Sequence, residues 1–345
     1  MDGNADPLVS IVIVNYEAGD ILRECVRSIT EADYKNVEII LVDNNSEDKG
    51  YRDVKKEFPQ VVLVENGENL GYCGGNNVGI SRCTGEYVVI LNPDTVVTPG
   101  WLHGLLDGYG RLGEGLYQPR LLSYDDKERI NTAGNWIHLL GFGFSSGKGG
   151  RDDGGTEGRI GFASGACLFT KKEVIDRIGM FDEFLFAYHD DLELGWRAAK
   201  AGIRSYYVPS STVYHAESLT FGWGRKKYFL LERNRWYCLL VHYSRGTLWR
   251  IMPALLLTEI LTLAFYAGRG MAGEKIRGYS SIMGNRGMIR KRHEEMEGSR
   301  KIPDAEIVGN FKDVMEIPAQ VSSDRAARAF NGVIGALSRM SRRLL

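Results

Sequence analysis

The sequence lacks the segments that mark secreted and membrane-spanning proteins. Its first ten residues, "MDGNADPLVS", contain no apolar signal segment, so we expect a protein that is not secreted. The most apolar stretch, residues 247–268, is interrupted by Arg250, Pro253 and Glu259. No uncharged run therefore approaches the about 18 residues expected of a membrane crossing. We expect this stretch to lie in a membrane interface or to pack on the body of the protein.

Cysteine is scarce, and its pattern argues against two further classes. The five cysteines are scattered, odd in number and form no C-x-x-C pair. This pattern argues against a disulfide framework and against a zinc site, and it indicates a reducing compartment. We therefore expect a cytoplasmic protein.

Charge is nearly balanced overall, with a net charge of −1, but it is unevenly distributed. Residues 269–345 carry more Lys and Arg than Asp and Glu, which suggests an anionic partner for this tail. The segment "RAARAFNGVIGALSRMSRRLL" places apolar faces beside arginines, as peripheral membrane proteins do. We expect peripheral membrane contact through residues 247–345 and no nucleic acid. A solvated tail, a dimerisation helix and helices packed on the body are the alternatives.

Strands and helices alternate over the first 110 residues. Branched apolar runs that end in polar residues predict buried strands at 8–16, 37–46, 61–66 and 85–95. The alternation predicts an α/β fold with a mostly parallel central sheet flanked by helices. We expect a catalytic domain over residues 1–240 and a mostly helical, basic amphipathic extension over residues 241–345.

Polar residues follow several of the predicted strands. Ligands of open α/β sheets bind beyond the carboxyl ends of the strands. That edge would carry Asn15, Tyr16, Asp43, Asn92 and Asp94. Polar side chains at so many strand ends are hard to explain by packing alone, so the sequence predicts a binding site along one rim.

The glycine-rich segment "NLGYCGGNNVG" (69–79) does not have the G-x-G-x-x-G spacing of a dinucleotide loop. A Rossmann dehydrogenase would suit the alternating strands but needs that spacing. We interpret the glycines as allowing a close backbone approach to a ligand, with Asn69 and Asn76 as candidate contacts.

Three carboxylates, Asp190, Asp191 and Glu193, lie where a half-apolar helix begins. Asp190 as N-cap with Glu193 three residues later would form a capping box. Negative charge also suits the positive end of a helix dipole. Neither effect explains Asp191. The crowding of three carboxylates should raise the pKa of at least one of them.

Seven segments follow one family pattern in order. They are "VSIVIVNYEAGDILRECVRSI", "VEIILVDNNSED", "ENLGYCGGNNVGI", "GEYVVILNPDTVVTPGWL", "SGACLFTKKEV", "GMFDEFLFAYHDDLELGWRAAKAG" and "VPSSTVYH". Together they resemble glycosyltransferase family 2, and within it the rhamnosyltransferase-like branch. The resemblance covers roughly residues 8–238. It implies a GT-A fold, a UDP-, dTDP- or GDP-sugar donor, a divalent metal and inversion at the anomeric carbon.

The resemblance also implies donor contacts. Asp43 matches the family's base-contacting aspartate, with Asn15 and Tyr16 lining the same pocket. The alternative for Asp43 is a turn-forming residue. Arg233 matches a position near the phosphates, where an ordinary helix-surface charge is the alternative.

The family's metal motif, Asp-x-Asp, is Asn92-Pro93-Asp94 in this chain. The resemblance implies Asp94 as the main metal ligand, Asn92 as a ribose contact and His215 as a further ligand. A lone histidine at a strand end is otherwise structural. Oxygen ligands favour Mg²⁺ or Mn²⁺ over Zn²⁺.

The family's catalytic base is the second acid of a pair, which is Asp190-Asp191 in this chain. The resemblance therefore implies Asp191 as the base, and Asp190 would cap the helix and contact the acceptor. We therefore expect an inverting, metal-dependent glycosyltransferase that acts on a saccharide or lipid-linked acceptor in cell-envelope or glycoprotein glycan synthesis. It would work at the cytoplasmic face of the membrane. The alternative is a non-catalytic nucleotide-sugar binder, which Asn92 in place of an acid favours and which Asp94, Asp191 and His215 oppose.

Overall fold

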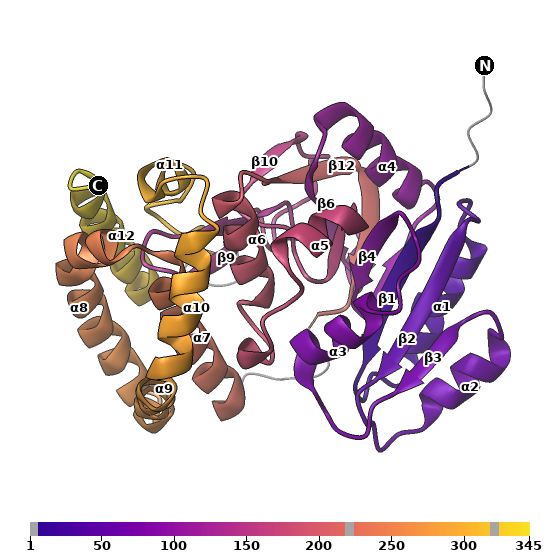
Figure 1. The fold of residues 1–345 in the computed structure, drawn as a ribbon, viewed down its shortest axis with the longest axis horizontal. Coiled ribbons are helices and arrows are strands. Elements are labelled where there is room, and N and C mark those ends of the chain that lie inside the picture. The colour runs from indigo at the N-terminus through magenta and orange to yellow at the C-terminus, as the bar shows by residue number, and fades with distance from the viewer. Residues whose placement is uncertain (1–5, 218–223, 318–323) are drawn as a thin grey trace.

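The computed structural model describes residues 6–217, 224–317 and 324–345 of the chain. One large sheet forms its centre, with strands in the order β10-β12-β6-β11-β4-β1-β2-β3 (Figure 1). The strands on this path are β1 (Val9–Asn15), β2 (Val37–Asp43), β3 (Val62–Glu65), β4 (Tyr87–Leu91), β6 (Gly115–Ser123), β10 (Gly158–Ile160), β11 (Cys167–Lys171) and β12 (Arg204–His215). The short strands β5 (Thr95–Val97) and β7 (Ile130–Thr132) pair beside β12 and β6, and β8 (Asn135–Ile137) with β9 (Gly143–Ser145) forms a separate hairpin.

The four strands predicted from the first 110 residues are confirmed. β1 pairs in parallel with β2 and β4, and β2 with β3. The second half of the sheet is mixed, because β11 runs antiparallel to both β4 and β6. Every parallel strand of the first half therefore ends at one edge, which carries the polar residues that follow β1, β2 and β4.

Helices cover both faces of the sheet, as buried parallel strands require. Those of the first 200 residues are α1 (Ile21–Glu31), α2 (Gly50–Glu57), α3 (Gly71–Ile80), α4 (Trp101–Leu112), α5 (Lys172–Ile178) and α6 (Asp190–Lys200), with a short 3₁₀ helix η1 (Glu183–Leu185). One apolar cluster packs α1, α2 and α4 on one side, and another packs α3, α5 and α6 on the other.

The chain beyond β12 is helical, as predicted. Its helices are α7 (Arg225–His242), α8 (Arg245–Ala267), α9 (Ala272–Gly284), α10 (Arg286–Gly298), α11 (Asp304–Gly309) and α12 (Arg325–Arg342). They pack at the end of the molecule opposite β3 and α2 (Figure 1). The expected boundary at residue 240 falls within α7, and one hydrophobic cluster contains residues from both sides of it, among them Ile40, Trp196 and Ile334.

Candidate active site

A cavity of about 550 Å³ opens at the carboxyl ends of β1, β2 and β4. It continues past the β8–β9 hairpin to the start of α6 and to α7. The predicted site residues that line it are Tyr16, Asn69, Asn92, Asp94, Asp190, Asp191 and His215. The fold thus brings together residues that are up to about two hundred positions apart in the chain, because strand ends share one edge of the sheet.

Asp94 and His215 face each other because β5 pairs antiparallel with the end of β12, so that Thr95 lies opposite His215. His215 Nε2 lies 3.3 Å from Asp94 Oδ1. This buried oxygen makes no hydrogen bond to any described residue. Burial alone would raise the pKa of Asp94, but the nearby His215 outweighs it, and the pKa lies below its ordinary value.

The orientation of the His215 ring follows from two residues that the sequence analysis did not identify. Asn131 Nδ2 donates to a carboxylate oxygen of Glu217 at 3.1 Å, which turns Asn131 Oδ1 toward His215 Nδ1, also at 3.1 Å. Nδ1 therefore carries a proton. Nε2, which faces Asp94, donates to the carboxylate when the ring is charged and offers a lone pair to a cation when the ring is neutral. Asn92 Nδ2 is 3.4 Å from the same Nε2, a long hydrogen-bond distance.

The positive charge between His215 Nε2 and Asp94 Oδ1, which are 3.3 Å apart, is the proton of a charged ring or a metal cation that takes its place. An oxygen and an imidazole nitrogen are ligands that Mn²⁺ accepts, so the pair fits a divalent cation. Within the described residues no group of three or more His, Cys, Asp or Glu could hold a metal. A cation bound here would need further ligands, and donor phosphates would supply them.

Asp190 and Asp191 begin α6 and both line the cavity. Asp191 Oδ2 accepts a hydrogen bond from the Gly165 backbone N–H at 3.1 Å, and Asp190 Oδ1 accepts one from the Asp191 N–H at 2.9 Å. Burial raises the pKa of Asp190, and the charge of Asp191 raises it further. Burial also raises the pKa of Asp191, against the backbone hydrogen bonds that it accepts.

The capping-box interpretation of this helix start is wrong. The N-cap is His189, in a left-handed conformation with φ 61°, and its side chain makes no capping hydrogen bond. Glu193 is fully buried and pairs with Arg197 at 2.6 Å, while His242 Nε2 lies 3.1 Å from its other oxygen. Asp190 is thus not the N-cap but lies in the first turn, where its Oδ1 accepts the Asp191 N–H, and it lines the cavity.

The loop before α6 also lines the cavity and is strained. Phe186, Tyr188 and His189 all have φ between 61° and 66°, a region that costs energy for side chains other than glycine. Asn234 holds this loop from α7, because its Nδ2 lies within 2.9 Å of the carbonyl oxygens of Leu185, Ala187 and Tyr188.

Helix α3 holds the same loop from the other side. The Cys73 N–H donates to the Phe186 carbonyl at 3.1 Å. Gly71 precedes this contact with φ +72°, and a Cβ there would come within 2.4 Å of the Phe186 carbonyl oxygen. Gly71 is therefore needed for a close approach of backbone to backbone. It also lines the cavity, so the predicted approach to a ligand stays a prediction.

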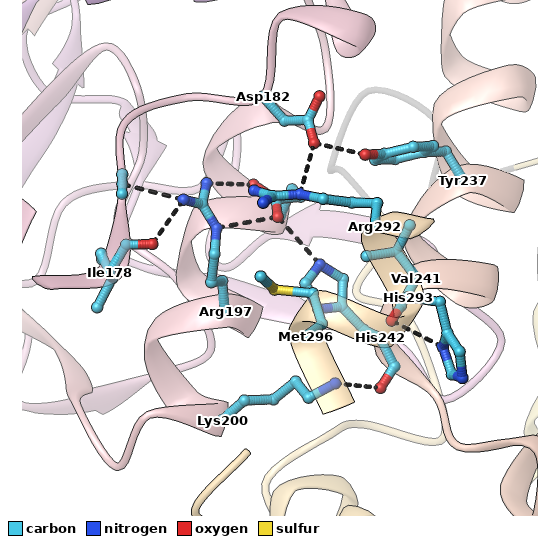
Figure 2. Close-up of polar contacts among 12 residues, drawn as sticks. Ile178, Asp182, Arg197, Lys200, Tyr237, Val241, His242, Arg292, His293 and Met296 are labelled. Atoms are coloured by element: carbon cyan, nitrogen blue, oxygen red, sulfur yellow. Dashed lines mark hydrogen bonds and ion pairs between the residues drawn. The ribbon is translucent and has the colours of Figure 1, made fainter. Parts of the chain in front are cut away.

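Buried polar contacts fix α6 to the C-terminal helices. Figure 2 shows Arg197, His242 and Arg292 converging from α6, α7 and α10. Arg197 also donates to the carbonyl of Ile178, and Arg292 pairs with Asp182 at 3.1 Å. Burial would raise the pKa of the Glu193 carboxyl, but the charge of Arg197 and the hydrogen bond from His242 hold it well below its ordinary value. The helix that carries Asp191 is thus anchored outside the cavity.

Four predicted contacts do not line the cavity. Asp43 is buried, accepts from Asn15 Nδ2 at 2.7 Å and accepts the Ser46 N–H, which is the turn-forming role considered as its alternative. Asn76 is buried and donates to the Tyr72 carbonyl within α3. Arg233 donates to the carbonyls of residues 184 and 185, beside the loop that Asn234 holds. Donor contacts by these four residues stay predictions.

The chain was compared with known proteins. A sequence profile described as "Glycosyl transferase family 2" matches residues 10–179, and one described as "Glycosyltransferase like family 2" matches residues 129–238. An N-acetylglucosaminyl-diphospho-decaprenol L-rhamnosyltransferase of Mycobacterium tuberculosis is 27% identical over 267 residues, which are 70% of this chain and 87% of that protein.

Two solved structures are similar in fold. GalNAc-T7 with UDP, GalNAc and Mn²⁺ superposes with a TM-score of 0.59 at 17% identity, over 72% of this chain and 51% of that one. TarS 1–349 of S. aureus superposes with a TM-score of 0.52 at 12% identity, over 98% of this chain and 92% of that one. At these identities the likeness concerns the fold alone, and with TarS it extends over nearly the whole chain.

Proposed function

We propose that this chain, which belongs to glycosyltransferase family 2, transfers a sugar from a nucleotide-sugar donor to a hydroxyl group of a saccharide or lipid-linked acceptor. The GT-A fold and the rhamnosyltransferase-like branch predicted from the sequence are both confirmed. The observation that carries the proposal is that one cavity contains both the Asp94–His215 pair and the Asp190–Asp191 pair. The first pair suits a diphosphate with a cation, and the second suits proton transfer.

Asp191 is the proposed general base. A hydroxyl oxygen that attacks the anomeric carbon must lose its proton, and a carboxylate within the cavity can accept it. The Gly165 N–H orients the Asp191 carboxylate by its hydrogen bond to Oδ2. Attack from the face opposite the departing diphosphate gives inversion, which we propose for this chain. Asp190, beside it, would contact the acceptor.

Asp94 and His215 would hold Mg²⁺ or Mn²⁺, and the buried Asp94 Oδ1, which accepts no hydrogen bond from the described residues, supports this assignment. Such an ion neutralises the charge that develops on a leaving diphosphate. By holding a proton on His215 Nδ1, Asn131 and Glu217 would leave Nε2 available as the ligand of such an ion. Asn92 lines the same wall and would contact the ribose.

The acceptor and the place of action are inferred from chemistry. The mycobacterial relative is named for transfer to a diphospho-decaprenol lipid, which supports a lipid-linked acceptor and a role in cell-envelope or glycoprotein glycan synthesis. All five cysteines of this chain, each within the described residues, are free and buried. Free thiols suit a reducing compartment, so we propose the cytoplasmic face of the membrane.

The test is thermal shift with UDP-, dTDP- and GDP-sugars, with and without Mn²⁺, followed by an assay of nucleotide release. A bound donor should raise the melting temperature by mass action. Asp191→Asn should keep this shift and lose turnover by about a hundredfold or more. Stabilisation by a donor without any hydrolysis or transfer would instead favour the non-catalytic binder that Asn92 suggests, and stabilisation by no donor would reject both.

A further inference from the structure

Helix α8 exposes a continuous apolar face. The side chains on its exposed side are Trp249, Arg250, Pro253, Leu256, Leu257, Ile260, Leu263, Ala264 and Ala267. Their spacing of three, four and seven residues places them along one side of the helix. Trp249 is 75% exposed and Ile260 is 64% exposed, values typical of surface lysines rather than of large apolar side chains. At 1.5 Å per residue the face runs for about 27 Å.

An exposed apolar surface of this length marks an interaction site, because soluble monomers rarely leave one uncovered. Among the described helices, α8 is the only one long and apolar enough to cross a membrane by composition, and only a third of its most apolar window is buried. The exposed face of α8 is therefore covered either by a bilayer or by another protein surface. The opposite side of α8 and its neighbour α12 distinguish these possibilities.

The opposite side of α8 is tied to the protein by charges. Glu259 forms ion pairs with Arg235 of α7 and with Lys275 of α9, the latter at 2.8 Å. Both cations are fully buried. Moving Glu259 into a lipid core would break these pairs and leave buried charges uncompensated. Helix α8 therefore stays on the protein and offers only its outer face, so it would lie along a membrane surface rather than cross it.

The charges around this face suit anionic lipid headgroups. Arg250 lies on the face itself, and Arg245, which is also exposed, lies about one turn before Trp249 on the same side. Helix α12, which packs against α8, contains no acidic residue, and Arg325, Arg339 and Arg343 in and after it are exposed. Each basic residue near an anionic membrane surface adds about 1 kcal/mol of attraction. A second copy of the chain would bring the same arginines against each other.

The geometry points to the outer face of α8, with the arginines of α12, as a docking surface for an anionic lipid bilayer. The apolar side chains enter the boundary between headgroups and acyl chains, with Trp249 at that depth. The catalytic body stays in water. This surface does not depend on the proposed glycosyl transfer, since binding to lipid is measured without donor or acceptor.

The test is co-flotation of the full-length protein with vesicles of phosphatidylcholine alone and of phosphatidylcholine mixed with phosphatidylglycerol. We expect binding to the anionic vesicles that weakens at high salt. The double variant Leu256→Glu, Ile260→Glu should bind at least about tenfold more weakly, because each change removes an apolar group and adds a repelled charge. The matched control is Val62→Glu, an exposed apolar residue of β3 at the other end of the molecule.

The contribution of the arginines to vesicle binding is tested by a second double variant and its matched control. Arg325→Glu with Arg339→Glu should weaken binding to anionic vesicles by about tenfold, whereas two equal changes elsewhere, Arg82→Glu with Arg159→Glu, should leave it within about twofold. Unchanged melting temperature and donor hydrolysis would show that the variants fold. Equal binding by the α8 double variant and the wild type would overturn the proposal.

Two further measurements separate the bilayer from other occupants. Brominated lipids should quench tryptophan fluorescence in the wild type and clearly less in Trp249→Phe. An alkaline wash should release the protein from vesicles, and retention after the wash would contradict docking along the surface, because a spanning helix resists it. A wild-type dimer that does not bind vesicles, and that Leu256→Glu with Ile260→Glu converts to a monomer, would show an interface between copies instead.

Discussion

At the scale of single residues, the neighbouring carboxylates Asp190 and Asp191 lower the stability of the folded protein. They do so at the position where the proposed site needs them. A carboxyl whose pKa is raised in the folded state holds its proton to higher pH than in the unfolded chain. The free energy of unfolding then falls as pH rises above the ordinary carboxyl range. A salt-bridged aspartate has the opposite effect, because its pKa is lowered in the folded state. Asp190→Asn keeps the acceptor for the Asp191 N–H and removes this cost.

We therefore expect Asp190→Asn to raise the free energy of unfolding at neutral pH by at least about 1 kcal/mol, the equivalent of less than one pKa unit. The gain should vanish at pH values below the ordinary aspartate pKa, where both forms are neutral. Urea unfolding of wild type and variant at neutral and acidic pH measures it. A gain that is the same at both pH values would show that the pair is not strained by charge.

The raised pKa of Asp191, caused by burial, also predicts the pH dependence of turnover. Only the ionised carboxylate can act as base, so kcat/KM should fall on the acidic side with an apparent pKa above that of an ordinary aspartate. Asp94, whose pKa is lowered by His215 against the effect of burial, stays ionised through this range. A pH–rate profile whose acidic limb lies at or below the ordinary aspartate value would contradict Asp191 as base.

Asn131 tests the cation site without using activity. Asn131→Leu removes the acceptor that fixes the proton on His215 Nδ1, and the ring is then free to turn or change tautomer. We expect Mn²⁺ affinity, measured by electron paramagnetic resonance with nucleotide present, to weaken by about 10- to 100-fold. Asn285→Leu, an exposed amide after α9, is the matched control. Equal Mn²⁺ affinity of Asn131→Leu and wild type would remove Asn131 from the site.

At the scale of elements, α7 determines the shape of the cavity although it follows the last strand. The two N–H donors of its buried Asn234 are shared among three carbonyls of the strained loop before α6. Without that amide the loop would relax from its left-handed conformations and carry the start of α6 with it.

Asn234→Leu should accordingly lower kcat by about tenfold or more and reduce stability by about 1–3 kcal/mol, the cost of unsatisfied buried carbonyls. KM for the donor should change less, because the Asp94–His215 pair lies on a different wall. Steady-state kinetics with thermal melts separate the two effects. A loss of stability with unchanged kcat would assign Asn234 a structural role alone.

At the scale of the whole molecule, the catalytic body and the C-terminal helices share one core. Trp196 of α6 stacks on His242 and packs edge-on against Tyr243 and Phe311, all beyond residue 240. A chain that ends at residue 240 would expose these apolar surfaces. We expect it to be insoluble or to lack a cooperative thermal transition by circular dichroism, and a truncated chain that still melts cooperatively and binds donor would show an independent domain.

The sequence by itself determined the order of the first four long strands, the helical nature of the C-terminal part, the rim on which the site lies and seven of the residues that line the cavity. These follow from local patterns, since parallel strands with polar ends bring those ends to one edge whatever the packing beyond. It did not reveal that Asn131 and Glu217 orient His215, that Asp43 turns inward to Asn15, or that Glu193 is buried against Arg197 and His242. Each of these depends on side chains from distant segments. Only tertiary packing decides which of them meet, and burial then sets which carboxylates keep their charge.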